Sequence, residues 1–333
     1  MQRFLNDPDD IVDETVRGFV RAHADRVRLH PDNDRVVAAR EAPVDGKVGI
    51  VTGGGSGHEP AFIGYTGAGA VDAVAVGELF SSPTAKSFRD AIAAADGGRG
   101  VVVLYGNYAG DNMNVKMAAK MAAKDDVEVL TVVANDDVSS APPEEREKRR
   151  GVAGEIFMWK IGGAKAAEGA DAEAVRAAAQ GAIDACRSVG VGLGPCTLPA
   201  VGHPNFTIEP GKMEMGIGHH GEPGTAVTDL GTADEVAAEM TRIVLDDHDL
   251  PEGTEVAVLV SGLGATPRNE LYVLYDRMAR DIEARGLVIH KAYVGDYFTS
   301  LEMVGATLTV MALDEERKRL LAAPTGCPAL GAA

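Results

Sequence analysis

Short apolar runs alternate with helical segments along the first half of the sequence, and this alternation constrains the fold more than any other feature. Four runs are rich in β-branched residues, and they span residues 48–52, 71–76, 101–104 and 127–133. Helix-like segments near 83–95 and 112–124 separate the later runs. Such an order is typical of a parallel sheet covered by helices on both faces. We therefore expect an α/β fold, with a mostly parallel sheet flanked by helices in an N-terminal domain.

The pattern changes in the second half of the chain. Residues 189–224 are dense in glycine and proline, which favours turns and short strands. We place a domain boundary there, with an α/β domain over residues 1–190 and a smaller α+β two-layer domain over 191–333. The remaining helices are expected at 10–27, 153–167, 171–187, 233–244 and 268–285, and the remaining strands at 255–260, around 291 and at 307–312.

The charge and the cysteines limit the function classes. The 333 residues carry a formal charge of −18, which argues against a nucleic-acid partner and suits a high-salt cytoplasm. No run approaches the roughly 18 apolar residues of a membrane span, and the N-terminus lacks the apolar core of a signal peptide. Cys186, Cys196 and Cys327 follow no zinc-ligand spacing. We expect a cytoplasmic protein with free thiols, without a bound metal and without a membrane partner.

A glycine run follows the first apolar segment. Residues 53–57 read GGGSG and are followed by His58. Backbone N–H groups in such a loop can surround an oxygen-rich ligand at the carboxyl edge of a sheet. A tight structural turn would not explain the titratable histidine that ends the run. We therefore favour a binding function, although no GK[ST] follows and the run is not a Walker A motif.

Two further segments carry candidate reactive side chains. Residues 216–221 match GxGxxG, but a turn and not a helix follows, so a dinucleotide site is rejected. Neighbouring residues on an extended chain point to opposite faces, so His219 and His220 are not expected to bind one metal ion, and one of them is expected to do chemistry. Asp111 follows another strand. It is either the N-cap of a helix that begins near Asn112 or a general base that faces the same crevice as His58.

Eight segments together resemble the dihydroxyacetone-binding K subunit of dihydroxyacetone kinases. They occur in the family's order and span nearly the whole chain. These segments are GGGSGHEP (53–60), GELFSSP (77–83), NYAGD (107–111), RRGVAGEIF (149–157), GPCTLPAVG (194–202), MGIGHHGEPG (215–224), GLGATP (262–267) and TSLEMVGATLT (299–309).

The resemblance implies a role for each matching residue. His220 would add through Nε2 to the C2 carbonyl of the ketone and form a covalent hemiaminal, which separates ketones from polyols such as glycerol. His58 would transfer the proton, and Asp111 would accept the proton of the terminal hydroxyl during phosphoryl transfer. His219 occupies a position that is usually aliphatic, so its replacement is expected to be mild. The residues expected to bind substrate oxygens are Gly55, Ser56, Gly57, His58 and Asp111.

The resemblance also implies partners. No cofactor is expected on this chain, because longer single-chain members carry a nucleotide-binding domain after this region and the sequence ends without one. The donor, ATP or ADP with Mg²⁺, would sit on a separate L subunit, with a phosphotransferase M subunit as a further partner. The chain itself is expected to form a homodimer.

One binding loop departs from the family pattern. Many members read Lys-Asn-Tyr-Thr-Gly-Asp there, whereas this chain has Gly106 and Ala109 at the lysine and threonine positions. A related kinase of a longer ketose such as erythrulose is therefore an alternative. A non-catalytic ketone sensor is a second alternative, against which the retained His220 and Asp111 argue. A metal hydrolase that uses His58, His220 and Asp111 is a third.

Overall fold

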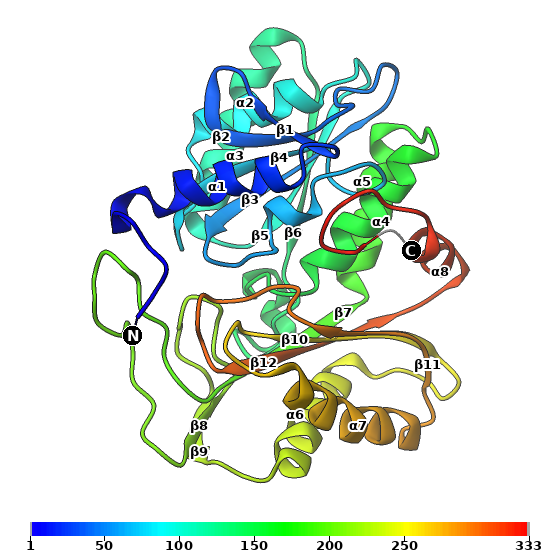
Figure 1. The fold of residues 1–333 in the computed structure, drawn as a ribbon. Helices are drawn as coiled ribbons and strands as arrows, with labels where there is room; N and C mark the ends of the chain where they lie inside the picture. Colours follow the sequence, from blue (N-terminus) through cyan, green and yellow to red (C-terminus); the bar gives the residue numbers. More distant parts are fainter. Residues whose placement is uncertain (1, 332–333) are drawn as a thin grey trace.

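A computed structural model describes residues 2–331 and contains two six-stranded sheets with helices between them and on both outer sides (Figure 1). The first sheet has the strand order β1-β2-β4-β3-β5-β6. Strands β3 to β6 are parallel to one another, while β1 and β2 add an antiparallel edge next to β4. Its strands are β1 (Val27–His30), β2 (Asn33–Ala39), β3 (Gly49–Ser56), β4 (Ala73–Leu79), β5 (Val101–Gly106) and β6 (Val129–Ala134). The expected mostly parallel sheet is confirmed.

Both faces of the first sheet are covered. Helices α2 (Ala85–Ala95) and α3 (Ala109–Ala122) pack on one face with residues such as Phe88. The other face contacts α1 (Ile11–Ala22), α4 (Glu155–Ala167) and α5 (Ala172–Asp184). Burial on both faces explains why β5 is a continuous apolar run.

The helix expected over residues 10–27 is too long. Helix α1 ends at Ala22, and Val27 begins β1, where it pairs with Ala39 of β2. The helical spacing of Val27 was a coincidence, because pairing with β2 buries this side chain in the sheet. Tertiary pairing therefore overrides the local pattern.

The second sheet has the order β11-β10-β12-β7-β8-β9, in which only the β10 and β11 pair is parallel among the described strands. Helices α6 (Ala233–His248) and α7 (Arg268–Ala284) cover its outer face. Its strands are β7 (Cys186–Gly192), β8 (Lys212–Met215), β9 (Ala226–Asp229), β10 (Glu255–Gly262), β11 (Val288–Gly295) and β12 (Gly305–Ala312). Short 3₁₀ helices occur at Pro8–Asp10, Ile63–Tyr65, Ala123–Asp125 and Pro143–Lys148.

The two sheets share one hydrophobic core. Trp159 of α4 belongs to the same buried cluster as Leu259 of β10 and Met311 of β12. Helix α8 (Glu315–Ala322) follows the last strand of the second sheet and packs back on α4. The α4–α5 layer therefore lies between the sheets, as Figure 1 shows in green. This packing holds the facing edges of the two sheets in a fixed arrangement.

Residue 190, where the sequence analysis divides the chain, lies inside β7. This strand pairs with β12 and β8 in the middle of the second sheet. The glycine-rich segment after it forms the loops of that sheet and does not mark its beginning. We place the boundary between the part of the chain that forms the first sheet and the part that forms the second at Ala185, directly before β7. Helix α8, at the end of the chain, packs back on α4.

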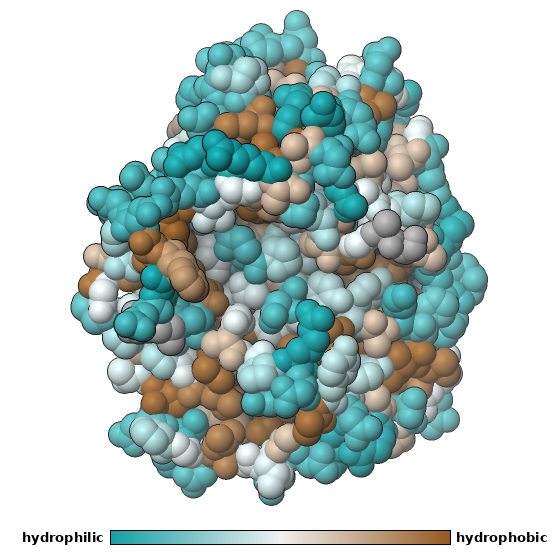
Figure 2. All heavy atoms as spheres, in the orientation of Figure 1, coloured by the Kyte–Doolittle hydropathy of each residue, from teal (hydrophilic) through white to brown (hydrophobic). Residues whose placement is uncertain are grey.

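The surface is strongly polar. Figure 2 shows hydrophilic residues over most of one face, as the charge of −18 requires. Brown apolar areas gather in the lower part of this view, in the region of α6 and β9. Within residues 2–331, no helix has both the length and the apolar character that a bilayer crossing needs.

A buried ion pair connects the loop before α4 to α6. Arg149 is 1% exposed and donates to both carboxylate oxygens of Asp247, at 2.9 and 2.6 Å. We expect Asp247→Ala to lower the free energy of unfolding by about 3–5 kcal/mol, because it leaves a buried guanidinium without its carboxylate. Urea unfolding measures this loss. Asp246→Ala is the control, since this half-exposed neighbour should cost less than about 1 kcal/mol, and equal losses would contradict the prediction.

Candidate active site

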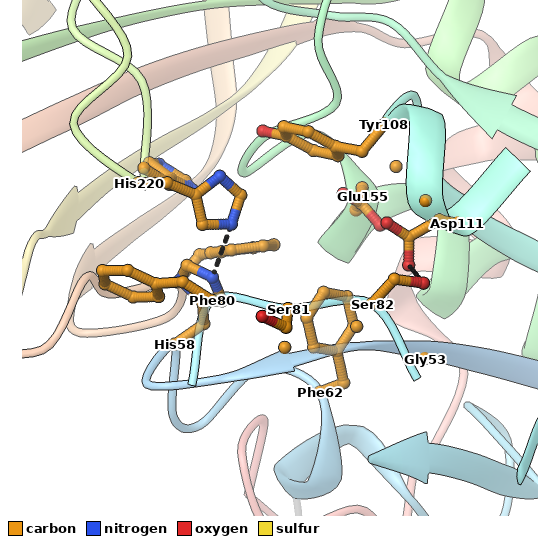
Figure 3. A pocket seen from close by; sticks show the side chains of 16 residues that line it. Gly53, His58, Phe62, Phe80, Ser81, Ser82, Tyr108, Asp111, Glu155 and His220 are labelled. Atoms are coloured by element: carbon orange, nitrogen blue, oxygen red, sulfur yellow. Dashed lines mark hydrogen bonds between the residues drawn. The ribbon is translucent and has the colours of Figure 1, made fainter. Parts of the chain in front are cut away.

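A cavity lies between the carboxyl edge of the first sheet and the loops of the second. Its volume is about 180 Å³, below the several hundred Å³ of pockets for drug-sized ligands. Figure 3 shows its walls, to which both sheets contribute. The lining residues are Gly53, Gly54, Gly55, His58, Phe62, Phe80, Ser81, Ser82, Gly106, Tyr108, Gly110, Asp111, Glu155, His219, His220 and Phe298.

The glycine run belongs to a strand, whereas the sequence analysis expected a loop from Gly53 onward. Strand β3 continues to Ser56, and its glycines pair with β4. The reason for glycine is close packing. A Cβ on Gly54 would overlap the ring of Phe62, and one on Gly55 would lie 2.6 Å from the backbone nitrogen of Ser81. Because these glycines have no side chains, the cavity extends to the backbone of β3.

Ser56 and Gly57 do not line the cavity, although Gly55 does. The Ser56 hydroxyl donates to the carbonyl oxygen of Gly77 at 2.9 Å. The Gly57 N–H donates to the carboxylate of Glu59, with a nitrogen–oxygen distance of 3.0 Å. Their hydrogen-bonding groups are thus used within the wall of the site.

His58 is fixed by bonds at both ring nitrogens. Its Nδ1 lies 2.7 Å from the carbonyl oxygen of Thr299, and its Nε2 lies 3.1 Å from Nε2 of His220. Since a carbonyl only accepts, Nδ1 of His58 carries a proton. The ring is buried and stacks on Phe80, with centroids 4.9 Å apart. Burial, with His220 and His219 nearby, holds the pKa of His58 well below its usual value.

His220 comes from the loop between β8 and β9, and Glu222 orients it. Its Nδ1 lies 2.7 Å from one carboxylate oxygen, and its backbone N–H donates to the other at 2.9 Å. Burial alone would raise the pKa of Glu222, but the bonds from His220 lower it to about 2. Glu222 is therefore ionised, and Nδ1 of His220 carries a proton.

The two Nε2 atoms are therefore the ring positions that face each other in the cavity. Nδ1 of His58 donates to a carbonyl oxygen and Nδ1 of His220 donates to a carboxylate, so a hydrogen bond between the Nε2 atoms needs one further proton. When either ring takes that proton, Nε2 of the other presents a lone pair to the cavity. This arrangement provides a nucleophile and an acid 3.1 Å apart.

His219 forms part of the cavity floor and points away from the pair. Its Nε2 lies 3.2 Å from the hydroxyl of Thr307, and its ring contacts Phe298 with centroids 4.6 Å apart. Burial lowers the pKa of His219 to about 3, so this ring is neutral near neutral pH. His219 and His220 thus point in different directions, and Nδ1 of His219 is buried without a hydrogen-bond partner among the described residues.

Asp111 lies at the other end of the cavity. It is the third residue of α3, which begins at Ala109 and not near Asn112 as expected, so Tyr108 and not Asp111 occupies the N-cap position. The Ser82 hydroxyl donates to its Oδ1 at 3.0 Å (Figure 3). Burial raises the pKa of Asp111 to about 6, although the bond from Ser82 opposes this shift. His58 and Asp111 therefore face one cavity from the ends of neighbouring strands.

Sequence reasoning missed Glu155, Glu222 and the aromatic lining from Phe80 and Phe298. Glu222 had a usable signal, because an acid two residues after His220 in a tight loop can reach its ring. Glu155 had none, since an acid in the first turn of a helix is ordinary. The metal-hydrolase alternative finds no ligand set, because within residues 2–331 no three His, Cys, Asp or Glu side chains are grouped to hold an ion.

Comparisons with known proteins agree over nearly the whole chain. The Dak1 domain model matches residues 17–329. The dihydroxyacetone-binding subunit of a PTS-dependent dihydroxyacetone kinase from Listeria innocua is 40% identical, over 98% of each chain. An L-erythrulose 1-kinase from Mycolicibacterium smegmatis is also 40% identical, over 99% of this chain but 58% of its own length. Among solved structures, a dihydroxyacetone kinase operon co-activator has a TM-score of 0.89 at 30% identity, covering 95% of this chain and 97% of its own.

Proposed function

This chain belongs to the Dak1 domain family, and we propose that it is the ketone-binding, catalytic subunit of a dihydroxyacetone kinase. It captures dihydroxyacetone on His220 and phosphorylates its terminal hydroxyl to give dihydroxyacetone phosphate. The observation that carries this proposal is the 3.1 Å contact between the Nε2 atoms of His58 and His220, in one cavity with Asp111. The function for which the Listeria innocua relative is named supports it.

The capture step needs one proton, which His58 takes up from the solvent at Nε2 as the ketone binds. The free Nε2 of His220 attacks C2 of the ketone. The π electrons of the carbonyl move to its oxygen, which receives the proton from His58. The low pKa leaves His58 neutral in the resting site and makes its protonated form a strong acid, which suits transfer to the carbonyl oxygen. The positive charge stays on the alkylated His220 ring beside the Glu222 carboxylate, so charges and protons balance.

Asp111 completes the reaction at the other end of the ketone. Its carboxylate accepts the proton of the terminal hydroxyl as that oxygen attacks the phosphorus of the donor, and the rest of the donor leaves with the bonding electrons. Capture at C2 holds this hydroxyl near Asp111, which removes the entropy cost of positioning it. A polyol without a carbonyl cannot be held in this way.

The phosphoryl donor is proposed to sit on a separate L subunit, as ATP or ADP with Mg²⁺, with an M-type phosphotransferase protein as a further partner. A cavity of about 180 Å³ has no room for a nucleotide beside a ketone, so the donor must approach from outside. The relative described as one subunit of a PTS-dependent kinase supports this division. We also propose a homodimer.

The purified chain with an L subunit tests the proposal. We expect phosphorylation of dihydroxyacetone that depends on this second subunit, with either ATP or a phosphotransferase relay as donor. Saturable ketone binding without turnover from either donor would instead favour a ketone sensor, a class to which the co-activator structure is relevant. The presence of Asp111 in the cavity supports the enzyme, because a sensor needs no general base.

A kinase of erythrulose is a second candidate, favoured by two observations. Gly106 places no side chain in the wall, and a relative of 40% identity is an L-erythrulose 1-kinase. Comparing kcat/KM for dihydroxyacetone and erythrulose decides between them. A preference for erythrulose of tenfold or more, about 1.4 kcal/mol, would assign the longer ketose.

Ser82 should tune the proton affinity of Asp111. Its hydroxyl donates to the carboxylate, so Ser82→Ala removes a bond that stabilises the charged form and raises the pKa of Asp111 above its value of about 6. We expect the acid limb of kcat/KM to move to higher pH, with a smaller loss of activity at pH 8. A pH–rate profile measures this shift, and an unmoved acid limb would contradict the role of this bond.

A further inference from the structure

Glu155 is the least satisfied acidic side chain of the cavity. This first residue of α4 is 1% exposed, lines the cavity, and has no hydrogen-bond partner at either carboxyl oxygen. Among residues 2–331, no other buried carboxyl group has both oxygens unpartnered. Burying a carboxyl group without a partner costs free energy, and the cost is larger for the charged form than for the neutral one. Native proteins therefore rarely keep such a group without a use.

The space around Glu155 shows where its carboxyl group points. A Cβ built on Gly106 would lie 2.6 Å from Oε1 of Glu155. The carboxyl group thus fills the place that any larger side chain at the end of β5 would take. Figure 3 shows Glu155 between Tyr108 and Asp111, with its oxygens directed toward the Asp111 end of the cavity.

The surroundings of this carboxyl group favour its protonated form. Burial raises the pKa of Glu155 well above its usual value, and the nearby Asp136 and Asp111 add to the shift. Asp111 has a pKa of about 6 and is ionised at neutral pH. In its protonated form Glu155 can donate a hydrogen bond, whereas ionised Asp111 can accept a proton.

We infer that Glu155 is a substrate-binding residue, whose carboxyl O–H donates a hydrogen bond to a ketose hydroxyl at the Asp111 end of the cavity. This inference rests on the proposed function and adds the group that recognises a hydroxyl beside the carbonyl. A ketose hydroxyl satisfies the unpartnered carboxyl group, whereas an apolar ketone leaves it unpaired. The site therefore selects hydroxylated ketones over plain ones, by the penalty for an unpaired buried group.

Two variants of Glu155 test the inference. Glu155→Leu removes both oxygens at a similar volume, and Glu155→Gln keeps a hydrogen-bond donor. We expect Glu155→Leu to weaken dihydroxyacetone binding by about 10–100-fold, while Glu155→Gln stays within about tenfold of the original chain. The urea midpoint of Glu155→Leu should equal or exceed that of the original chain, because an unpartnered buried group has been removed.

Two further variants make the outcome decisive. Thr66→Val removes another buried, unpartnered oxygen outside the cavity, so it should leave ketone binding unchanged. His220→Ala in the same binding assay tests the proposed function separately. Wild-type binding by Glu155→Leu, equal losses in Glu155→Gln and Glu155→Leu, or a lower midpoint for Glu155→Leu would overturn the inference. Loss of ketone binding in His220→Ala, with binding retained in Glu155→Leu, would support the proposed function and overturn this inference about Glu155.

Discussion

Replacing His220 by alanine is expected to reduce ketose phosphorylation by roughly 10³-fold or more, because the nucleophile that holds the substrate is lost. The same variant should lose saturable binding of dihydroxyacetone, since hydrogen bonds alone hold such a small ligand weakly. Calorimetry and initial rates with the donor subunit measure the two effects. His220 is part of a loop, so the fold should survive its truncation.

His219→Leu is the matched control for this prediction. His219 is the preceding residue and is more deeply buried than His220, but its ring points toward Thr307 and Phe298. We expect a far smaller loss of activity from this variant. Retention of phosphorylation by His220→Ala would refute covalent capture, and equal losses in the two variants would indicate general damage to the loop.

Replacing Asp111 by asparagine is expected to separate capture from phosphorylation. Asparagine has the same shape and still accepts the bond from Ser82, but it cannot take up a proton. Ketone binding should therefore persist, while kcat falls by about 10²–10⁴-fold, the range for loss of a general base. Asp90→Asn is the control, because this buried aspartate of α2 binds Lys86 outside the cavity.

The pH dependence of the unsubstituted chain follows from the same group. Asp111 acts when it is ionised, and burial raises its pKa to about 6. Activity as kcat/KM should therefore show an acid limb and fall as the pH drops through about 6. Loss of ketone binding in Asp111→Asn, or a profile without an acid limb near pH 6, would contradict its role as the base.

The sequence predicts the first sheet well where strands are buried on both faces. The run at 101–104 lies within β5 because each of its side chains is apolar. Strands β1 and β2 escaped prediction, since residues such as Arg28 and Asp34 interrupt their apolar pattern at a half-exposed edge. The glycines of β3 read as a loop because glycine disfavours strands, and only the pairing with β4 overrides that preference.

The site could be predicted in part. The rule that ligands bind at the carboxyl ends of parallel strands placed His58 and Asp111 together. No local pattern brings His220 to His58, because 162 residues separate them and two sheets must pack first. Glu155 could not be recognised either, since its chemistry comes from burial beside Gly106 and not from a motif.

The state of C2 in bound dihydroxyacetone tests the central claim most directly. Carbon-13 NMR of the chain saturated with ketone labelled at C2 reports whether that carbon is bonded to nitrogen. Capture by His220 predicts that the carbonyl resonance disappears and a resonance of a tetrahedral carbon bearing oxygen and nitrogen replaces it. The new resonance should be absent in His220→Ala. A bound ketone that keeps its carbonyl resonance would contradict the account.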